Sequence, residues 1–132
     1  MDAKIVTIDD EPAIRSLIRH ALHKEKYEIF EASNGEEGLK LIRKEIPDLI
    51  LLDVVMPEMN GLDTLEAIRK DALLSHIPVL MLTGVKDSEK LAVALTQPRT
   101  DFLAKPFLLE MLQQKVREIL KAQGFTQPPA VE

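Results

Sequence analysis

Short apolar runs along this chain alternate with longer stretches in which apolar residues recur every three or four positions. Five runs have the length of β-strands, and they lie at residues 4–8, 27–32, 49–52, 79–82 and 102–104. The run at 49–52 is Leu-Ile-Leu-Leu, with no polar residue inside it, which is typical of a strand covered on both faces. Strands of this kind belong to parallel sheets flanked by helices.

Helical spacing follows each of these runs. The first helix is expected to end near Lys24. Its inward stripe is predicted to consist of Ile14, Leu17, Ile18, Ala21 and Leu22. Ser33 and Glu36 form a capping-box pattern that predicts the start of the second helix, and Ile46 would extend its inward stripe. A short fourth helix is expected to begin near residue 87.

Strand and helix alternate five times, which requires right-handed crossovers and a parallel sheet with helices on both faces. The sequence therefore predicts an α/β fold, a doubly wound five-stranded sheet with the flavodoxin-like strand order 2-1-3-4-5. This domain is expected to span residues 1–121. Residues 122–132 lose the helical period and contain Gly124 and Pro128-Pro129, so we expect a flexible tail or the stub of a linker.

Polar residues follow the carboxyl ends of four of the predicted strands. Asp9 and Asp10 come directly after the first strand, and Asp53 comes after the third. In the predicted order these two strands are neighbours at the topological switch point, where open α/β sheets bind ligands. Thr83 and Lys105 end the fourth and fifth strands and join the same edge. The sequence therefore predicts one site made of these five residues.

Three carboxylates at one edge repel one another, since two unit charges about 4 Å apart cost about 4 kcal/mol at an effective dielectric constant of about 20. A cation would relieve that repulsion. Oxygen ligands without a nearby His or Cys select a hard ion, and a half-open site favours Mg²⁺ over Ca²⁺. Beside Mg²⁺, an ionised Asp53 could attack phosphorus and form an acyl phosphate. Thr83 and Lys105 could each hold one phosphoryl oxygen.

Four groups of residues occur in a characteristic order along the chain. They are Ile8-Asp9-Asp10-Glu11-Pro12, Leu52-Asp53 with Met56-Pro57 and Asn60-Gly61, Leu82-Thr83-Gly84, and Phe102-Leu103-Ala104-Lys105-Pro106-Phe107. Together they resemble the receiver domain of two-component response regulators, up to residue 121. The resemblance implies that Asp53 accepts a phosphoryl group from a histidine kinase, a phosphotransfer protein or a small phosphodonor. It also implies that Asp10, Asp53 and the backbone carbonyl of Val55 bind Mg²⁺, with Asp9 assisting through a water molecule.

The resemblance further implies a route for the output signal. Thr83 resembles the switch hydroxyl, and Phe102 resembles the aromatic residue that changes rotamer when Thr83 moves toward the phosphate. The signal would reach an effector or output domain through the face of helix 4, strand 5 and helix 5, and a phosphorylation-dependent homodimer fits the same face. Leu108 and Met111 would add an exposed apolar patch beside Phe102. Without the family, Phe102 is an ordinary core residue and the other two are ordinary surface residues.

The chain also departs from the family pattern. The family usually has a glycine-alanine pair before the last strand, where this chain has Pro98-Arg99, and proline cannot adopt a positive φ. We therefore expect helix 4 to end early. Leu108 stands where the family tends to place a polar cap. Val55 and Val85 stand where related receivers are often polar, so they would shield the phosphoryl group from water and slow its hydrolysis, unless they only pack their loops.

Other functions remain open. A haloacid-dehalogenase-like phosphatase also uses Asp, Mg²⁺, Thr and Lys, but it needs its nucleophile after the first strand with a second Asp two residues on, where this chain has Glu11. A degenerate receiver that only docks a partner would not need all five site residues. Asp9 and Asp10 could also serve only as caps of the first helix. We expect a phosphoacceptor switch rather than a multiple-turnover enzyme, with self-phosphorylation from small donors and slow autodephosphorylation.

Charge and composition limit which binding partners and which cellular compartment we expect for this chain. The net charge of −5 argues against direct nucleic-acid binding, which needs a basic face. No apolar run approaches the roughly 20 residues of a membrane span. The segment MDAKIVTIDDE carries charges where a signal peptide would be apolar. The absence of cysteine excludes disulfide and thiol chemistry but does not by itself fix the compartment. We therefore expect a cytoplasmic protein that binds neither nucleic acid nor membranes directly.

Overall fold

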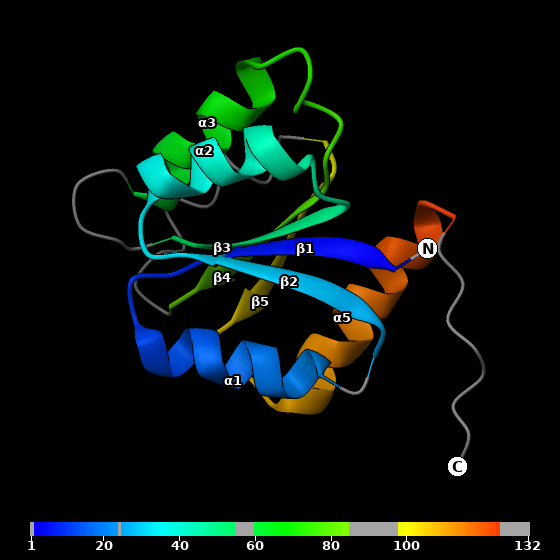
Figure 1. Ribbon diagram of the computed structural model, residues 1–132. Helices are drawn as coiled ribbons and strands as arrows, with labels where there is room; N and C mark the ends of the chain where they lie inside the picture. Colours follow the sequence, from blue (N-terminus) through cyan, green and yellow to red (C-terminus); the bar gives the residue numbers. More distant parts are fainter. Residues whose placement is uncertain (1, 24, 55–59, 85–97, 125–132) are drawn as a thin grey trace.

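A parallel sheet lies between two layers of helices (Figure 1). The computed structural model describes residues 2–23, 25–54, 60–84 and 98–124. The strands are β1 (Ala3–Ile8), β2 (Tyr27–Ala32), β3 (Leu49–Asp53), β4 (Val79–Thr83) and β5 (Thr100–Ala104), and the helices are α1 (Pro12–Leu22), α2 (Gly35–Glu45), α3 (Gly61–Lys70) and α5 (Leu109–Ala122). The sheet order is β2-β1-β3-β4-β5 with parallel neighbours. The predicted doubly wound α/β fold is therefore confirmed.

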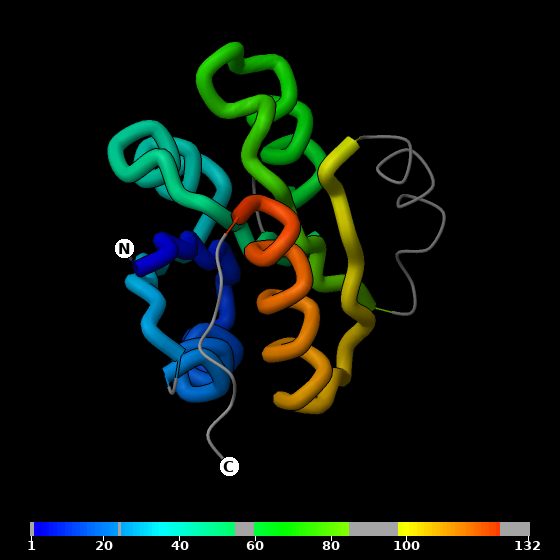
Figure 2. The backbone as a smooth tube through the Cα atoms, turned by 90° about the vertical axis from the view of Figure 1, so that its right-hand side faces the viewer, coloured from blue at the N-terminus to red at the C-terminus, as the bar shows by residue number. Residues whose placement is uncertain are grey.

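The middle strand β3 is buried on both faces. Its Leu49 and Leu51 pack into a core with α1 and α5, whereas Ile50 and Leu52 pack into a second core with α2 and α3. Figure 1 shows these helix pairs on opposite faces of the sheet, and Figure 2 shows α5 (orange) beside α1 (blue). Burial on both faces explains why no polar residue interrupts the run at 49–52.

α1 differs from the prediction in one inward position. It ends at Leu22, close to the end expected near Lys24. Ile18, Ala21 and Leu22 are buried, but Leu17 is 38% exposed. Leu17 lies about 100° around the helix from Ile18, at the edge of the buried stripe, which leaves its side chain in contact with solvent. The prediction that Leu17 is inward was therefore wrong.

α2 is capped one residue later than predicted. Asn34, rather than Ser33, is the N-cap, and its side chain accepts a hydrogen bond from the Glu37 backbone N–H at 2.8 Å. The Ser33 hydroxyl instead donates to the Glu37 carboxylate at 2.9 Å. At the other end, Ile46 is the C-cap with a left-handed φ of 44°, which turns the chain out of the helix and leaves its side chain 43% exposed rather than inward.

The connection into β5 places a positive φ on an arginine. Arg99 has φ 55°, and β5 begins at Thr100, two residues before the predicted start of the strand. A glycine would adopt this positive φ without strain, but here the residue that adopts it is Arg99, directly after Pro98. At the start of α5, Leu108 is the N-cap and makes no side-chain capping hydrogen bond.

Some predictions concern parts of the chain that lie outside the described residues. These are the helix expected near residue 87, the valines Val55 and Val85, and residues 125–132 of the expected tail. The structure carries α5 to Ala122, one residue past the expected domain boundary. None of the helices that the structure describes is both long and apolar enough to cross a membrane.

Candidate functional site

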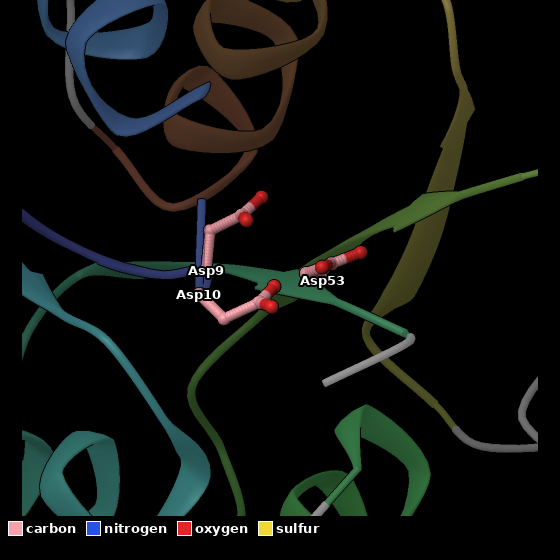
Figure 3. A group of neighbouring side chains, drawn as sticks. All are labelled: Asp9, Asp10 and Asp53. Carbon is pink, nitrogen blue, oxygen red and sulfur yellow. The ribbon is translucent and has the colours of Figure 1, made fainter. Parts of the chain in front are cut away.

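Three carboxylates meet where β1 and β3 end. Parallel pairing sets Ile8 of β1 opposite Leu52 of β3, so the residues that follow them, Asp9 and Asp53, lie on neighbouring strands at the same edge. One carboxylate oxygen from each of Asp9, Asp10 and Asp53 lies within 4.8 Å of the others (Figure 3). Asp9 and Asp53 are buried, whereas Asp10 is half-buried. The sheet therefore concentrates negative charge at its switch point.

Lys105 reaches the cluster from the end of β5. Its backbone N–H donates to the Thr83 carbonyl at 2.6 Å, which continues the pairing of β4 with β5 beyond Ala104. Its Nζ lies 3.0 Å from Asp53 Oδ1 and 3.5 Å from Asp9 Oδ2. Burial lowers the pKa of Lys105, but its hydrogen bond to Asp53 and the charges of Asp53 and Asp9 outweigh burial and hold that pKa above its ordinary value. The ammonium group therefore stays protonated and offsets part of the cluster's charge.

Asp9 has surroundings that fit a bound cation. Burial raises its pKa and the charge of Asp10 adds to the rise, against the Glu11 backbone N–H and Lys105, which lower it. Asp9 Oδ1 accepts the Glu11 N–H at 2.9 Å. Asp9 Oδ2 is buried without a hydrogen-bond partner among the described residues, and its contact with Lys105 at 3.5 Å is longer than a charge-assisted hydrogen bond. A buried, unsatisfied anionic oxygen beside two further carboxylates is a ligand set that suits a hard divalent cation.

Thr83 and Phe102 lie on one face of the sheet. Thr83 ends β4 and pairs with Ala104 of β5, and Phe102 lies two residues before Ala104, so the three side chains share a face. Thr83 is buried, whereas Phe102 is half-buried and packs against the core under α2 and α3. Thr83 also follows Leu82, which pairs with Asp53. This register brings the Thr83 hydroxyl to the edge that carries the carboxylates. The movement of Thr83 toward a phosphoryl group stays a prediction.

Leu108 and Met111 are exposed at the start of α5. Their exposed fractions are 67% and 50%. The Met111 N–H donates to the Leu108 carbonyl at 3.0 Å, so both residues lie at the first turn of α5. Their role, with Phe102, as a partner face stays a prediction.

Two residues shape the site in ways that the sequence did not indicate: Gly61, which appeared there only as part of a motif, and Arg15. A Cβ on Gly61 would lie 2.1 Å from the Asp53 carbonyl oxygen, so glycine is needed for α3 to begin this close to the end of β3. Arg15 of α1 donates from Nη1 to the Asp9 carbonyl at 2.5 Å. A glycine at the start of a helix could have signalled the close approach. An arginine on an amphipathic helix gives no sign of what it will bind.

The family of the chain follows from its sequence and its fold together. Residues 5–117 match the family model of the response regulator receiver domain, and the chain therefore belongs to that family. A receiver domain has a phosphorylation-dependent signalling role in two-component systems rather than a metabolic one. Receiver domains generally bind Mg²⁺ at an acidic pocket, and this chain has the cluster of Asp9, Asp10 and Asp53. The matches give no support to the haloacid-dehalogenase-like alternative.

Individual relatives agree with the family match. The alkaline phosphatase synthesis transcriptional regulatory protein PhoP of Bacillus subtilis is 34% identical over 128 residues, which cover 97% of this chain and 52% of that protein. The probable transcriptional regulator ycf27 of Guillardia theta is 35% identical over 89% of this chain and 45% of that protein. The solved structure of chemotaxis protein CheY4 of Vibrio cholerae is 33% identical, with a TM-score of 0.83, over 90% of this chain and 99% of that chain. This chain spans about half the length of the curated relatives it matches.

Proposed function

We propose that Asp53 accepts a phosphoryl group from a histidine kinase, a phosphotransfer protein or a small phosphodonor, and that this switches the domain between two signalling states. One observation carries the proposal: Asp9, Asp10 and Asp53 meet within 4.8 Å, and Lys105 Nζ lies 3.0 Å from Asp53 Oδ1. An ionised carboxylate next to a fixed ammonium group, at the open edge of a sheet, is suited to attack phosphorus.

The transfer exchanges one bond to phosphorus for another. A carboxylate oxygen of Asp53 forms the new bond, while the bond between phosphorus and the donor's nitrogen or oxygen breaks and the donor atom keeps the electron pair. The product is an acyl phosphate on Asp53. Lys105, whose pKa is raised by Asp53 and Asp9, would hold one phosphoryl oxygen. The Thr83 hydroxyl, at the end of β4, would hold another.

Asp10 and Asp53, with the backbone carbonyl of Val55, would hold Mg²⁺, and Asp9 would assist through a water molecule. When bound, Mg²⁺ would offset the repulsion among the carboxylates and part of the phosphoryl charge. The buried Asp9 Oδ2, which lacks a hydrogen-bond partner among the described residues, supports a cation at this place. The part assigned to Val55 rests on the resemblance to the family alone.

The surface that carries the output signal would lie away from the phosphoryl group. Thr83 would move toward the phosphate and Phe102 would change rotamer, so that helix 4, β5 and α5 present a new surface. That surface would bind an effector or an output domain, or a second copy in a phosphorylation-dependent homodimer. Leu108 and Met111 supply exposed apolar side chains for such a contact.

We propose a cytoplasmic location, where a kinase and an effector could both reach the site. The receiver domain, expected from the sequence to span residues 1–121, would extend to Ala122, where α5 ends, and a flexible tail or the stub of a linker would follow. The net charge of −5 supports partners other than nucleic acid for this domain.

Incubation with acetyl phosphate and MgCl₂ tests the proposed function against its rivals. Intact mass reports phosphoryl groups on the protein, and the release of inorganic phosphate reports turnover. A switch gains one phosphoryl group and releases phosphate slowly, at the rate at which the acyl phosphate decays. A phosphatase releases many equivalents without accumulating the adduct, and a docking module shows neither signal. Either of the last two results would overturn the proposal.

A further inference from the structure

The peptide bond between Asp9 and Asp10 is held from outside the site by Arg15. The Arg15 guanidinium donates from Nη1 to the Asp9 carbonyl oxygen at 2.5 Å. That carbonyl belongs to the peptide unit that joins Asp9 to Asp10, so the bond fixes the plane from which both carboxylate side chains project. A rotation of this peptide would move both acids at once.

Arg15 is itself held in place by an acid on another element. Its Nε lies 3.3 Å from Oε1 of Glu31 on β2, and its side chain is 18% exposed. The second oxygen of Glu31 binds Nε of Arg19 at 2.6 Å. Glu31 thus offsets part of the charge of both arginines, and Arg15 binds the site through a neutral carbonyl rather than through a carboxylate. Arg15 therefore occupies no carboxylate oxygen of Asp9 or Asp10.

Two further bonds restrain Asp9 and give the Arg15 contact its effect. The Asp9 backbone N–H donates to the Ala32 carbonyl at 3.1 Å, and Asp9 Oδ1 accepts the Glu11 N–H at 2.9 Å. Together with the Arg15 bond, these contacts give three groups of Asp9 a hydrogen-bond partner: its N–H, its carbonyl and one carboxylate oxygen. The remaining oxygen, Oδ2, is the buried one that faces Lys105 at 3.5 Å. The three restraints together set the direction of that oxygen.

We infer that Arg15 is a positioning residue for cation binding: through the Asp9 carbonyl it holds Asp9 and Asp10 in the orientation that binds Mg²⁺. This inference rests on the proposed metal site. Without Arg15, the peptide between the two acids gains freedom that must be lost again when the cation binds, so affinity falls while the sheet and its cores remain. The phosphoryl-transfer step itself should be little changed once the cation is bound.

Arg15→Gln and Arg19→Gln form a matched pair of variants. Both arginines lie on α1 and both bind Glu31, but Arg19 donates to the Ile29 carbonyl at 3.1 Å rather than to Asp9. MgCl₂ is titrated into each protein and followed by calorimetry and by backbone amide chemical shifts. We expect the Kd of Arg15→Gln for Mg²⁺ to rise about tenfold, and that of Arg19→Gln to stay within about twofold of the wild type. The shifts also show whether each variant is folded.

Two further readouts separate positioning from a general structural effect. Arg15→Lys, which keeps one charged donor for the Asp9 carbonyl, should recover part of the lost affinity. In phosphorylation by acetyl phosphate, Arg15→Gln should need more Mg²⁺ for half-maximal rate, while its rate at saturating Mg²⁺ stays within about twofold of the wild type.

Several results would overturn the inference. They are an unchanged Kd for Mg²⁺ in folded Arg15→Gln, an equal loss in Arg19→Gln, and a loss of maximal rate that saturating Mg²⁺ does not restore. In each case Mg²⁺ binding and phosphorylation of the wild type would still support the proposed function. A wild-type protein that binds no Mg²⁺ would instead remove both the proposed site and this inference.

Discussion

Lys105 Nζ lies 3.0 Å from Asp53 Oδ1, although the two residues are 52 positions apart in the sequence. The contact joins the end of β5 to the end of β3 across β4, and the same ammonium group lies 3.5 Å from Asp9 Oδ2. Among the described residues, Lys105 is thus the cation that balances the buried carboxylates when no metal is bound.

Lys105→Met should lower the Tm of the metal-free protein, because it leaves Asp53 and Asp9 buried without their counter-charge. Removing one partner of a fully buried ion pair costs about 3–5 kcal/mol, and the partial exposure of Lys105 places the expected loss below that range. Thermal unfolding in EDTA and in MgCl₂ measures the effect, and Mg²⁺ should restore more stability to the variant than it adds to the wild type. An unchanged Tm in EDTA would contradict the role given to Lys105.

Asp10→Asn should stabilise the metal-free protein at neutral pH, while it weakens Mg²⁺ binding and phosphorylation. Burial, and then the charge of Asp10, raise the pKa of Asp9 above its ordinary 3.8. A carboxyl group with a raised pKa stabilises the fold below its ordinary pKa, and that contribution is lost as pH rises through the folded-state pKa. Neutralising Asp10 removes one cause of this loss of stability. Asp10→Asn should therefore be more stable than the wild type above the folded-state pKa of Asp9, and this difference should disappear below it.

Denaturant unfolding in EDTA across the pH range measures this difference in the free energy of unfolding. A metal-free Asp10→Asn protein that is less stable than the wild type at neutral pH would count against repulsion in the cluster.

Arg99→Gly should stabilise the protein. Arg99 has a positive φ of 55°, a conformation that costs a residue with a Cβ about 1–2 kcal/mol. Burial, and then the charge of Arg99, lower the pKa of nearby Arg69, so removal of the Arg99 charge should not weaken this region. The Arg99 carbonyl, which accepts hydrogen bonds from Val79 and Arg69, is retained in the variant.

Arg99→Ala is the matched control, because it removes the charge but keeps the Cβ. Its free energy of unfolding should fall below that of Arg99→Gly by about 1 kcal/mol. Equal stability of the two variants would show that the backbone conformation carries no strain.

Replacing Val55 by Asn and Val85 by Glu should speed the loss of phosphate from the protein. The proposal is that the two valines shield the phosphoryl group, since neither can orient a water molecule for attack. If shielding is worth about 1.4 kcal/mol of barrier, decay of the acyl phosphate should be about tenfold faster in the doubly substituted protein. Decay is followed by intact mass after removal of the donor. With Mg²⁺ saturating, an unchanged or slower decay would indicate that these valines only pack their loops.

The sequence predicted the fold well because its main signals are local. An apolar run covered on both faces, such as 49–52, can occupy only a central strand, and five strand-length runs that alternate with helices leave few sheet topologies. Helix ends were predicted less well. Ser33 and Asn34 are both good N-cap residues. Asn34 accepts the Glu37 backbone N–H, whereas Ser33 donates to the Glu37 carboxylate, and residue spacing alone does not show which of the two caps the helix.

The site was predictable where polar residues end strands, and not where a side chain of a helix contacts a neighbouring element. Asp9, Asp10 and Asp53 come together because β1 and β3 are neighbours in the sheet, and the alternation of strands and helices predicts that strand order. The hydrogen bond from Arg15 to the Asp9 carbonyl depends instead on how α1 lies against β2, which periodicity does not determine. Contacts of this kind have no sequence signature.

If Asp53 is the phosphoacceptor, its replacement by Asn should abolish phosphorylation, and a side-by-side measurement of the wild type and Asp53→Asn tests this. Both proteins are incubated with acetyl phosphate and saturating MgCl₂ and weighed intact, before and after hydroxylamine, which cleaves acyl phosphates. We expect one phosphoryl group on the wild type, its removal by hydroxylamine, and none on Asp53→Asn. Equal incorporation in the two proteins, or a wild-type adduct that resists hydroxylamine, would contradict this expectation.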